Sequence, residues 1–382
     1  MQLTHEHEEL RATTRRWLAE VVTPNADAWE AAGIYPAHEV MRSFGALGLI
    51  GTAKGERWGG MGLDWSYAAV VAETLGECAS GGVAMSLGVQ TDMCTPALEA
   101  RGSDALREEF LRPAIAGTSV GAIGVSEPGA GSDVAAIRTS ARMDGGDYVI
   151  NGSKTWITNG AQADWICLLC NTGDGPAHRN KSLIVVPMKS KGVEVTKRIV
   201  KMGMRASDTA TIFFDDVRVP ATNRIGEEGM GFVYQMEQFQ NERLWGALNT
   251  TAAAQRALDL TLEYTAERKA FGKAILDNQY VAFKLAEMQT ELEALSALNW
   301  RGVAEMMAGK DATRTATMAK LKAGRLAREV VDGCLQFWGG MGYSEDGPLA
   351  RIYRDTRLTS IGGGADEVML QILTKMMGSY AR

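Results

Sequence analysis

The chain has 382 residues, of which 46% are hydrophobic and 23% are charged, and this balance predicts an ordinary soluble protein with a large core divided into two or three structural units. Its net charge of −6 is modest and no basic block stands out, which excludes a typical nucleic-acid-binding surface. The charged N-terminal segment has no apolar signal region, and no apolar run reaches the roughly 18 residues of a membrane-spanning helix, so we expect a cytoplasmic protein without a membrane partner.

The apolar pattern changes twice along the chain. In residues 1–119 apolar positions recur at helical spacing, as in EELRATTRRWLAEVV with Thr4 as a candidate N-cap, which predicts an N-terminal helical domain. Residues 120–225 contain short β-branched or alternating runs such as SLIVVPM and predict a middle domain built as an antiparallel β-barrel or sandwich. Residues 226–382 are rich in helix formers and predict a C-terminal domain of several long helices, most simply a bundle.

The cysteines and histidines do not indicate a redox or metal centre. Five cysteines are an odd number without the spacing of a disulfide framework, so we expect free thiols. Cys167 and Cys170 have redox spacing, but their segment WICLLC has the length of a strand, on which residues three apart face opposite sides. The four histidines are too scattered to suggest a metal site, and we predict none.

Two segments of the middle domain have the composition of ligand-binding loops. In GVSEPGAGSDVAAIRTSA, glycine N–H groups and the hydroxyls of Ser126 and Ser132 are suited to a polar ligand, although a simple turn explains the same letters. In NGSKTWITNG, Trp156 and Thr158 share one face of a strand, so the indole can lie against a flat ring while the hydroxyl reaches its edge. The alternative is a core tryptophan beside a cross-strand threonine.

Three more segments stand out in the C-terminal region. In ERKAFGK, Arg268 is suited to a pyrophosphate and Phe271 to an adenine, or both belong to a helix surface with a capping glycine. QFWGGMGY interrupts the helical pattern with glycines and lets a ligand approach the main chain. SIGGGADEV, residues 360–368, is either a phosphate cradle or a turn that needs positive φ.

In this order, SEPGAGSD, GSKTWITNG, ERKAFGK, QFWGGMGY and the glycine stretch resemble the acyl-CoA dehydrogenases, over nearly the whole chain. The resemblance implies an α+β multidomain fold whose C-terminal domain is a four-helix bundle. It also implies a noncovalent FAD, an acyl-CoA substrate, a homotetramer and an electron-transfer flavoprotein as acceptor.

The resemblance assigns cofactor-binding residues one by one. Six residues of the middle domain match positions that hold the flavin, and Ser132 also matches a contact to the substrate's pantetheine: Val125, Ser126, Gly131, Ser132, Trp156 and Thr158. Four residues of the C-terminal domain match positions that hold the ADP half, partly across a subunit boundary: Arg268, Phe271, Gln336 and Gly340.

The catalytic base is expected at an unusual position. Many members carry a glutamate where this chain has Gly363, whereas a minority, including the isovaleryl- and long-chain types, place it on an early helix of the third domain before an arginine. Glu242 precedes Arg243 at that place, so we predict that Glu242 is the base, with a solvated helix carboxylate as the alternative. The N–H of Gly363 is then expected to polarise the thioester carbonyl, and Arg243 to bind substrate.

The expected reaction is α,β-dehydrogenation with hydride transfer from Cβ to flavin N5. Ala84 and Gly88 fall where medium-chain members carry larger polar side chains, so we expect them to border a deep or wide substrate pocket for a long or branched acyl chain, as in citronellyl-CoA dehydrogenase-like members. Three alternatives stay open: an oxygen-using acyl-CoA oxidase, a desulfinase-like lyase that needs no α-proton base, and a noncatalytic acyl-CoA-binding protein.

Overall fold

The computed structural model describes residues 3–378, and its N-terminal stretch is helical, as predicted. Thr4 is the N-cap of the first helix. A π-helical turn, Val89–Met93, continues α5 without a break. The helices of this stretch are α1 (His5–Trp17), α2 (Ala26–Ala32), α3 (Ala37–Ala46), α4 (Trp65–Leu75), α5 (Gly81–Gly88), α6 (Pro96–Arg101), α7 (Asp104–Leu106) and α8 (Arg112–Ile115).

The middle stretch forms one twisted sheet in the order β6-β7-β3-β2-β4-β5-β8, with β1 added beside β4. Its pairs are antiparallel except β1–β4 and β2–β4, which are parallel. The strands are β1 (Gly121–Gly124), β2 (Ser140–Asp144), β3 (Asp147–Thr158), β4 (Trp165–Asn171), β5 (Lys181–Pro187), β6 (Val193–Arg198), β7 (Thr209–Pro220) and β8 (Arg224–Ile225).

The sheet does not close, so the barrel form of the prediction is not realised. Its two halves nevertheless share one core. Ile150 of β3 and Ile212 of β7 belong to the same buried cluster as Leu168 of β4 and Ile184 of β5. The halves therefore pack against each other in the manner of a sandwich, while the other face of β4 and β5 packs on helices.

The C-terminal stretch is a helical bundle. Three long helices, α9, α10 and α11, pack on one another, and the shorter α13 contacts both α9 and α11 to complete the predicted four-helix arrangement. Asp366 begins α14, as expected for an acid at a helix N-terminus. The elements are α9 (Gly231–Glu267), the hairpin of β9 (Lys269–Ala270) and β10 (Lys273–Ala274), α10 (Gln279–Met307), α11 (Thr313–Trp338), α12 (Gly340–Tyr343), α13 (Pro348–Thr356) and α14 (Asp366–Met376).

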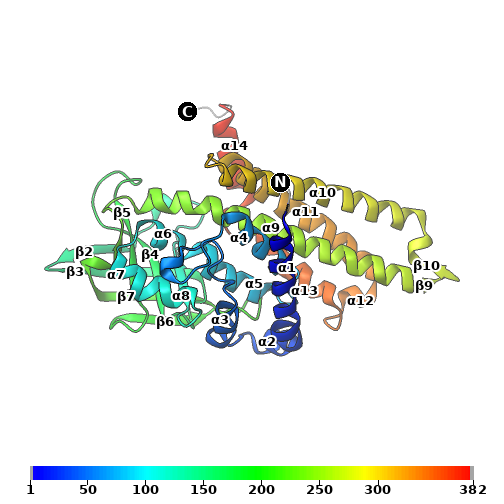
Figure 1. Cartoon of the computed structure of the whole chain (residues 1–382), viewed down its shortest axis with the longest axis horizontal. Coiled ribbons are helices and arrows are strands. Elements are labelled where there is room, and N and C mark those ends of the chain that lie inside the picture. Colours follow the sequence, from blue (N-terminus) through cyan, green and yellow to red (C-terminus); the bar gives the residue numbers. More distant parts are fainter. Residues whose placement is uncertain (1–2, 379–382) are drawn as a thin grey trace.

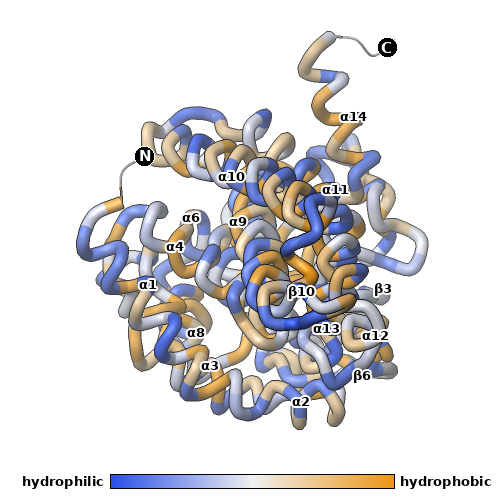
Figure 2. The backbone as a smooth tube through the Cα atoms, turned by 90° about the vertical axis from the view of Figure 1, so that its right-hand side faces the viewer, coloured by the Kyte–Doolittle hydropathy of each residue, from blue (hydrophilic) through white to orange (hydrophobic). Residues whose placement is uncertain are grey.

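Helix α9 spans the molecule. It starts beside the sheet and ends at the β9–β10 hairpin at the opposite end of the bundle (Figure 1). Its 37 residues correspond to a length of about 55 Å. Helix α14 extends away from the rest of the bundle in both views (Figures 1 and 2). Among residues 3–378, no helix is long and apolar enough to cross a membrane.

The five cysteines are free, as predicted, and all of them are buried. Cys167 and Cys170 lie on opposite faces of β4 and belong to different core clusters, which confirms the strand interpretation of WICLLC. Burial raises the pKa of the Cys78 and Cys334 thiols to about 11. These thiols are therefore uncharged at neutral pH and unsuited to redox chemistry.

Candidate active site

Glu242 of α9 and the glycine loop before α14 face each other. A Cβ atom added to Gly363 would lie 3.3 Å from Oε1 of Glu242, so a side chain at position 363 would compete with this carboxylate for space. Gly363 has φ +63°, a left-handed conformation that glycine adopts without strain. Its N–H donates to no backbone group in the part of the chain that the structure describes. A carboxylate and a free backbone donor therefore meet at one place.

The space beside Glu242 continues along α9. A Cβ atom added to Gly246, one helical turn later, would meet no other atom within 4 Å. Gly246 and Gly363 thus flank Glu242 without filling its surroundings. Open space therefore lies beside Glu242 at Gly246, while Gly363 approaches the carboxylate closely.

Burial and two cations set the protonation of Glu242. Removal from water raises the pKa of this carboxyl to about 7, and the positive charges of Arg243 and Lys320 limit the rise. Lys320 of α11 is almost fully buried and donates through Nζ to the carbonyl of Gly364. Burial lowers the pKa of Lys320 to about 8. Lys320 thereby anchors the glycine loop and places a positive charge near the carboxylate.

Arg243 is buried but has an unpaired nitrogen. Its guanidinium lies over the ring of Phe239, with 5.7 Å between the guanidinium carbon and the ring centre. Its Nε atom lacks a hydrogen-bond partner among the described residues. An unpaired buried donor is costly, so this atom is suited to a ligand acceptor.

A buried ion pair joins the two glycine-containing segments of the middle domain. Nζ of Lys154 in β3 lies 2.9 Å from Oε1 of Glu127 and donates to the carbonyl of Val125 at 2.8 Å. Glu127 also accepts from the N–H groups of Arg138, at 2.7 Å, and Thr139, at 2.9 Å. Burial alone would raise the pKa of Glu127, but Lys154 and these donors hold it below its ordinary value. The sequence interpretation missed this pair, although a lysine inside an alternating strand needs a partner.

The outer surface of these segments is open. Trp156 is 63% exposed, so the alternative of a core tryptophan is wrong. It sits at a β-bulge, where the register of β3 against β7 shifts between Lys154 and Ile157, and its φ is +63°. Gly131 and Ser132 are exposed as well, and a Cβ atom added to Gly131 would meet nothing within 4 Å. The bulge turns an aromatic ring outward beside a loop that leaves its backbone accessible.

Contacts connect this surface to Glu242. Ser126 accepts through its carbonyl from the N–H of Thr155, next to Trp156, at 2.9 Å. Val125 belongs to a core cluster against which Phe239 packs, and Phe239 lies one helical turn before Arg243. Thr158, half-buried, ends β3 opposite Thr209. The middle-domain residues predicted to hold a flavin therefore lie in one neighbourhood with the start of α9.

The four residues predicted to hold the ADP half lie elsewhere. Arg268 ends α9, and Phe271 is fully exposed at the tip of the β9–β10 hairpin with φ +53°, so neither belongs to a helix surface. Gln336 and Gly340 lie near the end of α11, which is joined to α9 by the stacked rings of Tyr264 and Trp338, 4.2 Å apart. The 26 residues from Glu242 to Arg268 rise about 39 Å along α9. One chain therefore does not bring the two sets together.

The two positions expected to enlarge the substrate pocket differ in their surroundings. A Cβ atom added to Gly88 would lie 2.3 Å from Cζ2 of Trp245, so the indole fills the space that the glycine leaves. Ala84, also buried, borders a separate cavity of about 30 Å³ beside Met204 and Asp355. Extra depth at Gly88 is thus taken up by Trp245.

The comparisons with known proteins cover the whole chain. Family models for the N-terminal, middle and C-terminal domains of acyl-CoA dehydrogenase match residues 4–118, 122–217 and 229–378. The mitochondrial long-chain specific acyl-CoA dehydrogenase of Sus scrofa is 36% identical over 373 residues, 97% of this chain and 86% of the relative. The mitochondrial short-chain specific enzyme of Rattus norvegicus is 34% identical over 382 residues, 100% of this chain and 92% of the relative.

Solved structures agree with these relatives. The crystal structure of acyl-CoA dehydrogenase from Geobacillus kaustophilus has 37% identity and a TM-score of 0.95, with 98% of each chain covered. An FAD complex of PigA has 25% identity and a TM-score of 0.95, with 99% of each chain covered. Since the relatives include long-chain and short-chain types, similarity alone does not choose a chain length.

Proposed function

The chain belongs to the acyl-CoA dehydrogenase family, and we propose that it is an FAD-dependent dehydrogenase of a branched acyl-CoA with Glu242 as the catalytic base. The proposal rests on the position of Glu242, whose carboxylate lies next to Gly363. Burial raises the pKa of this carboxyl to about 7. A base works best when its pKa lies near the working pH. An ordinary solvated helix carboxylate has neither this burial nor this neighbour.

FAD fits the open surface of the middle domain. The outward indole of Trp156 offers a flat face, Thr158 a hydroxyl, and the loop at Ser126, Gly131 and Ser132 offers polar groups. When bound, FAD accepts the hydride that leaves the β-carbon of the substrate. As the partner that would take up the electrons, we assign an electron-transfer flavoprotein.

The ADP half would be held by a second copy of the chain. Arg268, Phe271, Gln336 and Gly340 lie at the far end of the bundle, about 39 Å along α9 from Glu242. The fully exposed Phe271 ring is suited to an adenine brought by a neighbour. We therefore propose that cofactor sites are shared between copies of the chain, within the homotetramer that the family resemblance implies.

The residues of this chain divide the proton chemistry among them. Glu242 removes the α-proton, and the N–H of Gly363 stabilises the negative charge that develops on the thioester oxygen. Arg243, with its unpaired Nε, binds the acyl-CoA, and Lys320 holds the Gly364 carbonyl so that the loop keeps its position. Gly363 lacks a carboxylate, so no like charge raises the pKa of Glu242 further.

The rate of acyl-CoA oxidation is expected to rise with pH to a plateau, with a midpoint near pH 7. Below that pH Glu242 is protonated and accepts no proton, because burial raises its pKa from 4.5 to about 7. The folded protein thus binds this proton more tightly than the unfolded chain does. The contribution of Glu242 to stability is therefore present at low pH and declines as pH rises from 4.5 to about 7. The measurement is the second-order rate constant of anaerobic flavin bleaching at low acyl-CoA concentration, followed against pH.

The variant Lys320→Met tests the electrostatic origin of that midpoint. Removing the positive charge is expected to raise the pKa of Glu242 and move the midpoint upward. Glu263→Gln, an exposed position on the same helix, is the matched control and should leave the midpoint unchanged. A wild-type midpoint near the ordinary carboxyl value would contradict the assignment.

The open space at Gly246 supports a branched substrate. It lies beside Glu242, where the α- and β-carbons react, whereas Trp245 fills the space at Gly88. An anaerobic titration with branched and straight acyl-CoAs, following the visible flavin band, tests this choice. Fastest bleaching by long straight chains would overturn the branched assignment, and bound FAD that no saturated acyl-CoA reduces would favour the lyase alternative. Rapid oxygen consumption would identify an oxidase.

A further inference from the structure

A cavity of about 340 Å³ lies between the N-terminal helices and α9. Its inner part is deeply buried, with Val71 and Ala72 of α4 against Trp245 of α9, and it also carries buried polar side chains, among them Lys54 and Asp92. Its outer part carries the exposed ion pair of Arg101 and Glu237, 3.4 Å apart. The cavity therefore opens near the surface and ends on the indole of Trp245.

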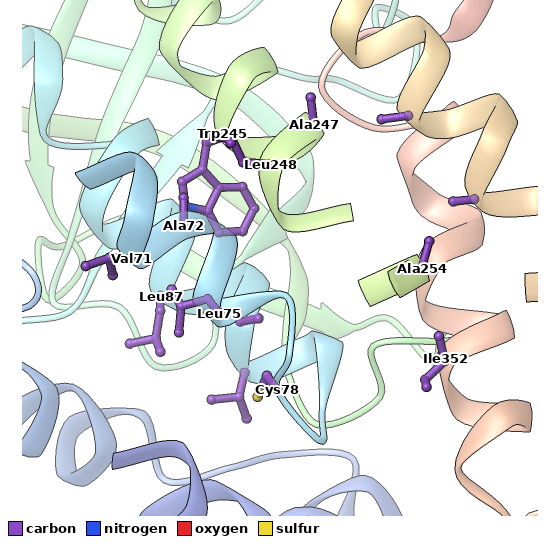
Figure 3. Packing of buried hydrophobic residues seen from close by; sticks show 14 of the residues in the cluster. Val71, Ala72, Leu75, Cys78, Leu87, Trp245, Ala247, Leu248, Ala254 and Ile352 are labelled. Atoms are coloured by element: carbon purple, nitrogen blue, oxygen red, sulfur yellow. The ribbon is translucent and has the colours of Figure 1, made fainter. Parts of the chain in front are cut away.

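Trp245 separates this cavity from the site around Glu242. It follows Glu242 by three residues on α9, so both side chains project toward the same side of the helix. One edge of its ring contacts Gly88, and Figure 3 shows the ring between α9 and the N-terminal helices, with its nitrogen toward Ala72. That nitrogen is buried and has no partner within the described chain. The indole is thus held by packing alone.

We propose that Trp245 is the specificity-determining residue that limits the length of the acyl chain, by closing the substrate site at Gly88 in front of this cavity. The inference rests on the proposed function, because it takes the acyl chain to extend from Glu242 toward Gly88. An alkyl chain that passed this point would enter the cavity along its apolar wall of Val71 and Ala72. The protein thus contains a cavity that could extend the substrate site, and the side chain of Trp245 closes it off.

The test measures binding to the FAD-loaded enzyme. The probes are S-alkyl-CoA thioethers of increasing length, which lack the carbonyl that activates the α-proton and so report binding without turnover. Wild-type affinity is expected to rise about fourfold with each buried methylene group and then reach a plateau. In Trp245→Ala the plateau should move to chains several methylene groups longer, whereas Trp245→Phe, which keeps an aromatic wall, should retain the wild-type plateau.

Trp65→Ala is the matched control. Trp65 lines the same cavity from α4, so its removal enlarges the cavity without opening the wall, and the plateau should not move. Because loss of a fully buried indole lowers stability, Trp245→Leu is measured beside Trp245→Ala, and either folded variant decides. If affinity reaches its plateau at the same alkyl length in the wild type, Trp245→Ala and Trp245→Leu, the proposed role of Trp245 is wrong. No binding of any thioether by the wild type would instead contradict the proposed function.

Discussion

Glu242→Gln is expected to slow flavin reduction by acyl-CoA by about 10²–10⁴-fold, the contribution of a general base. Glutamine keeps the size and hydrogen-bonding reach of the side chain but accepts no proton. FAD should remain bound, because Glu242 lies toward the glycine loop and not on the surface around Trp156. Stopped-flow measurement of anaerobic flavin bleaching, at a pH above 7 where Glu242 is ionised, gives the size of the loss.

Glu263→Gln provides the comparison for this loss. It makes the same chemical change on the same helix at an exposed position, and bleaching should keep the wild-type rate. Full activity in Glu242→Gln would remove the base assignment. Loss of FAD from that variant would mean that Glu242 supports the cofactor site instead.

Lys154→Met is expected to destabilise the protein by about 3–5 kcal/mol, because it leaves the buried carboxylate of Glu127 without its cation. Glu127 holds the N–H groups of Arg138 and Thr139, so the loop with Ser132 should lose its position and FAD content should fall as well. Urea unfolding of the purified variant and its visible absorbance per chain measure both effects.

Lys181→Met separates this effect from simple loss of a buried lysine. Lys181 is as buried as Lys154 and donates through Nζ to the carbonyl of Ala177 and the side chain of Asn180, each at 2.9 Å. Glu127 and Asp133 act on it only at longer range, without an ion pair. Its replacement leaves no carboxylate unpaired and should cost less. An equal loss of unfolding free energy in the two variants would show that the ion pair with Glu127 does not contribute beyond the burial of a lysine.

Local patterns made the order of helical, β and helical regions predictable. Periodicity of apolar residues and turn composition are properties of neighbouring residues, and they identified the strand WICLLC and the helix that begins at Asp366. The pairing of Glu242 with Gly363 followed from a family pattern rather than from spacing, and in the structure the two groups lie side by side.

Contacts between distant segments were not predictable in the same way. The sequence shows that Gly88 lacks a side chain, but only packing decides that Trp245 fills the space. The alternation of β3 does not reveal the bulge that turns Trp156 outward, because a bulge depends on the partner strand β7. The separation of Arg268 from Glu242 likewise depends on how straight α9 runs.

The buried thiols can report the unfolding of each structural region separately. Cys78, between α4 and α5, and Cys94 lie in the N-terminal region, Cys167 and Cys170 lie in the sheet, and Cys334 lies in the bundle. All five are buried in the folded protein. A thiol reagent added during partial denaturation therefore labels only the region that has opened. Peptide mapping of the labelled sites would show whether the sheet and the two helical regions unfold together or in sequence.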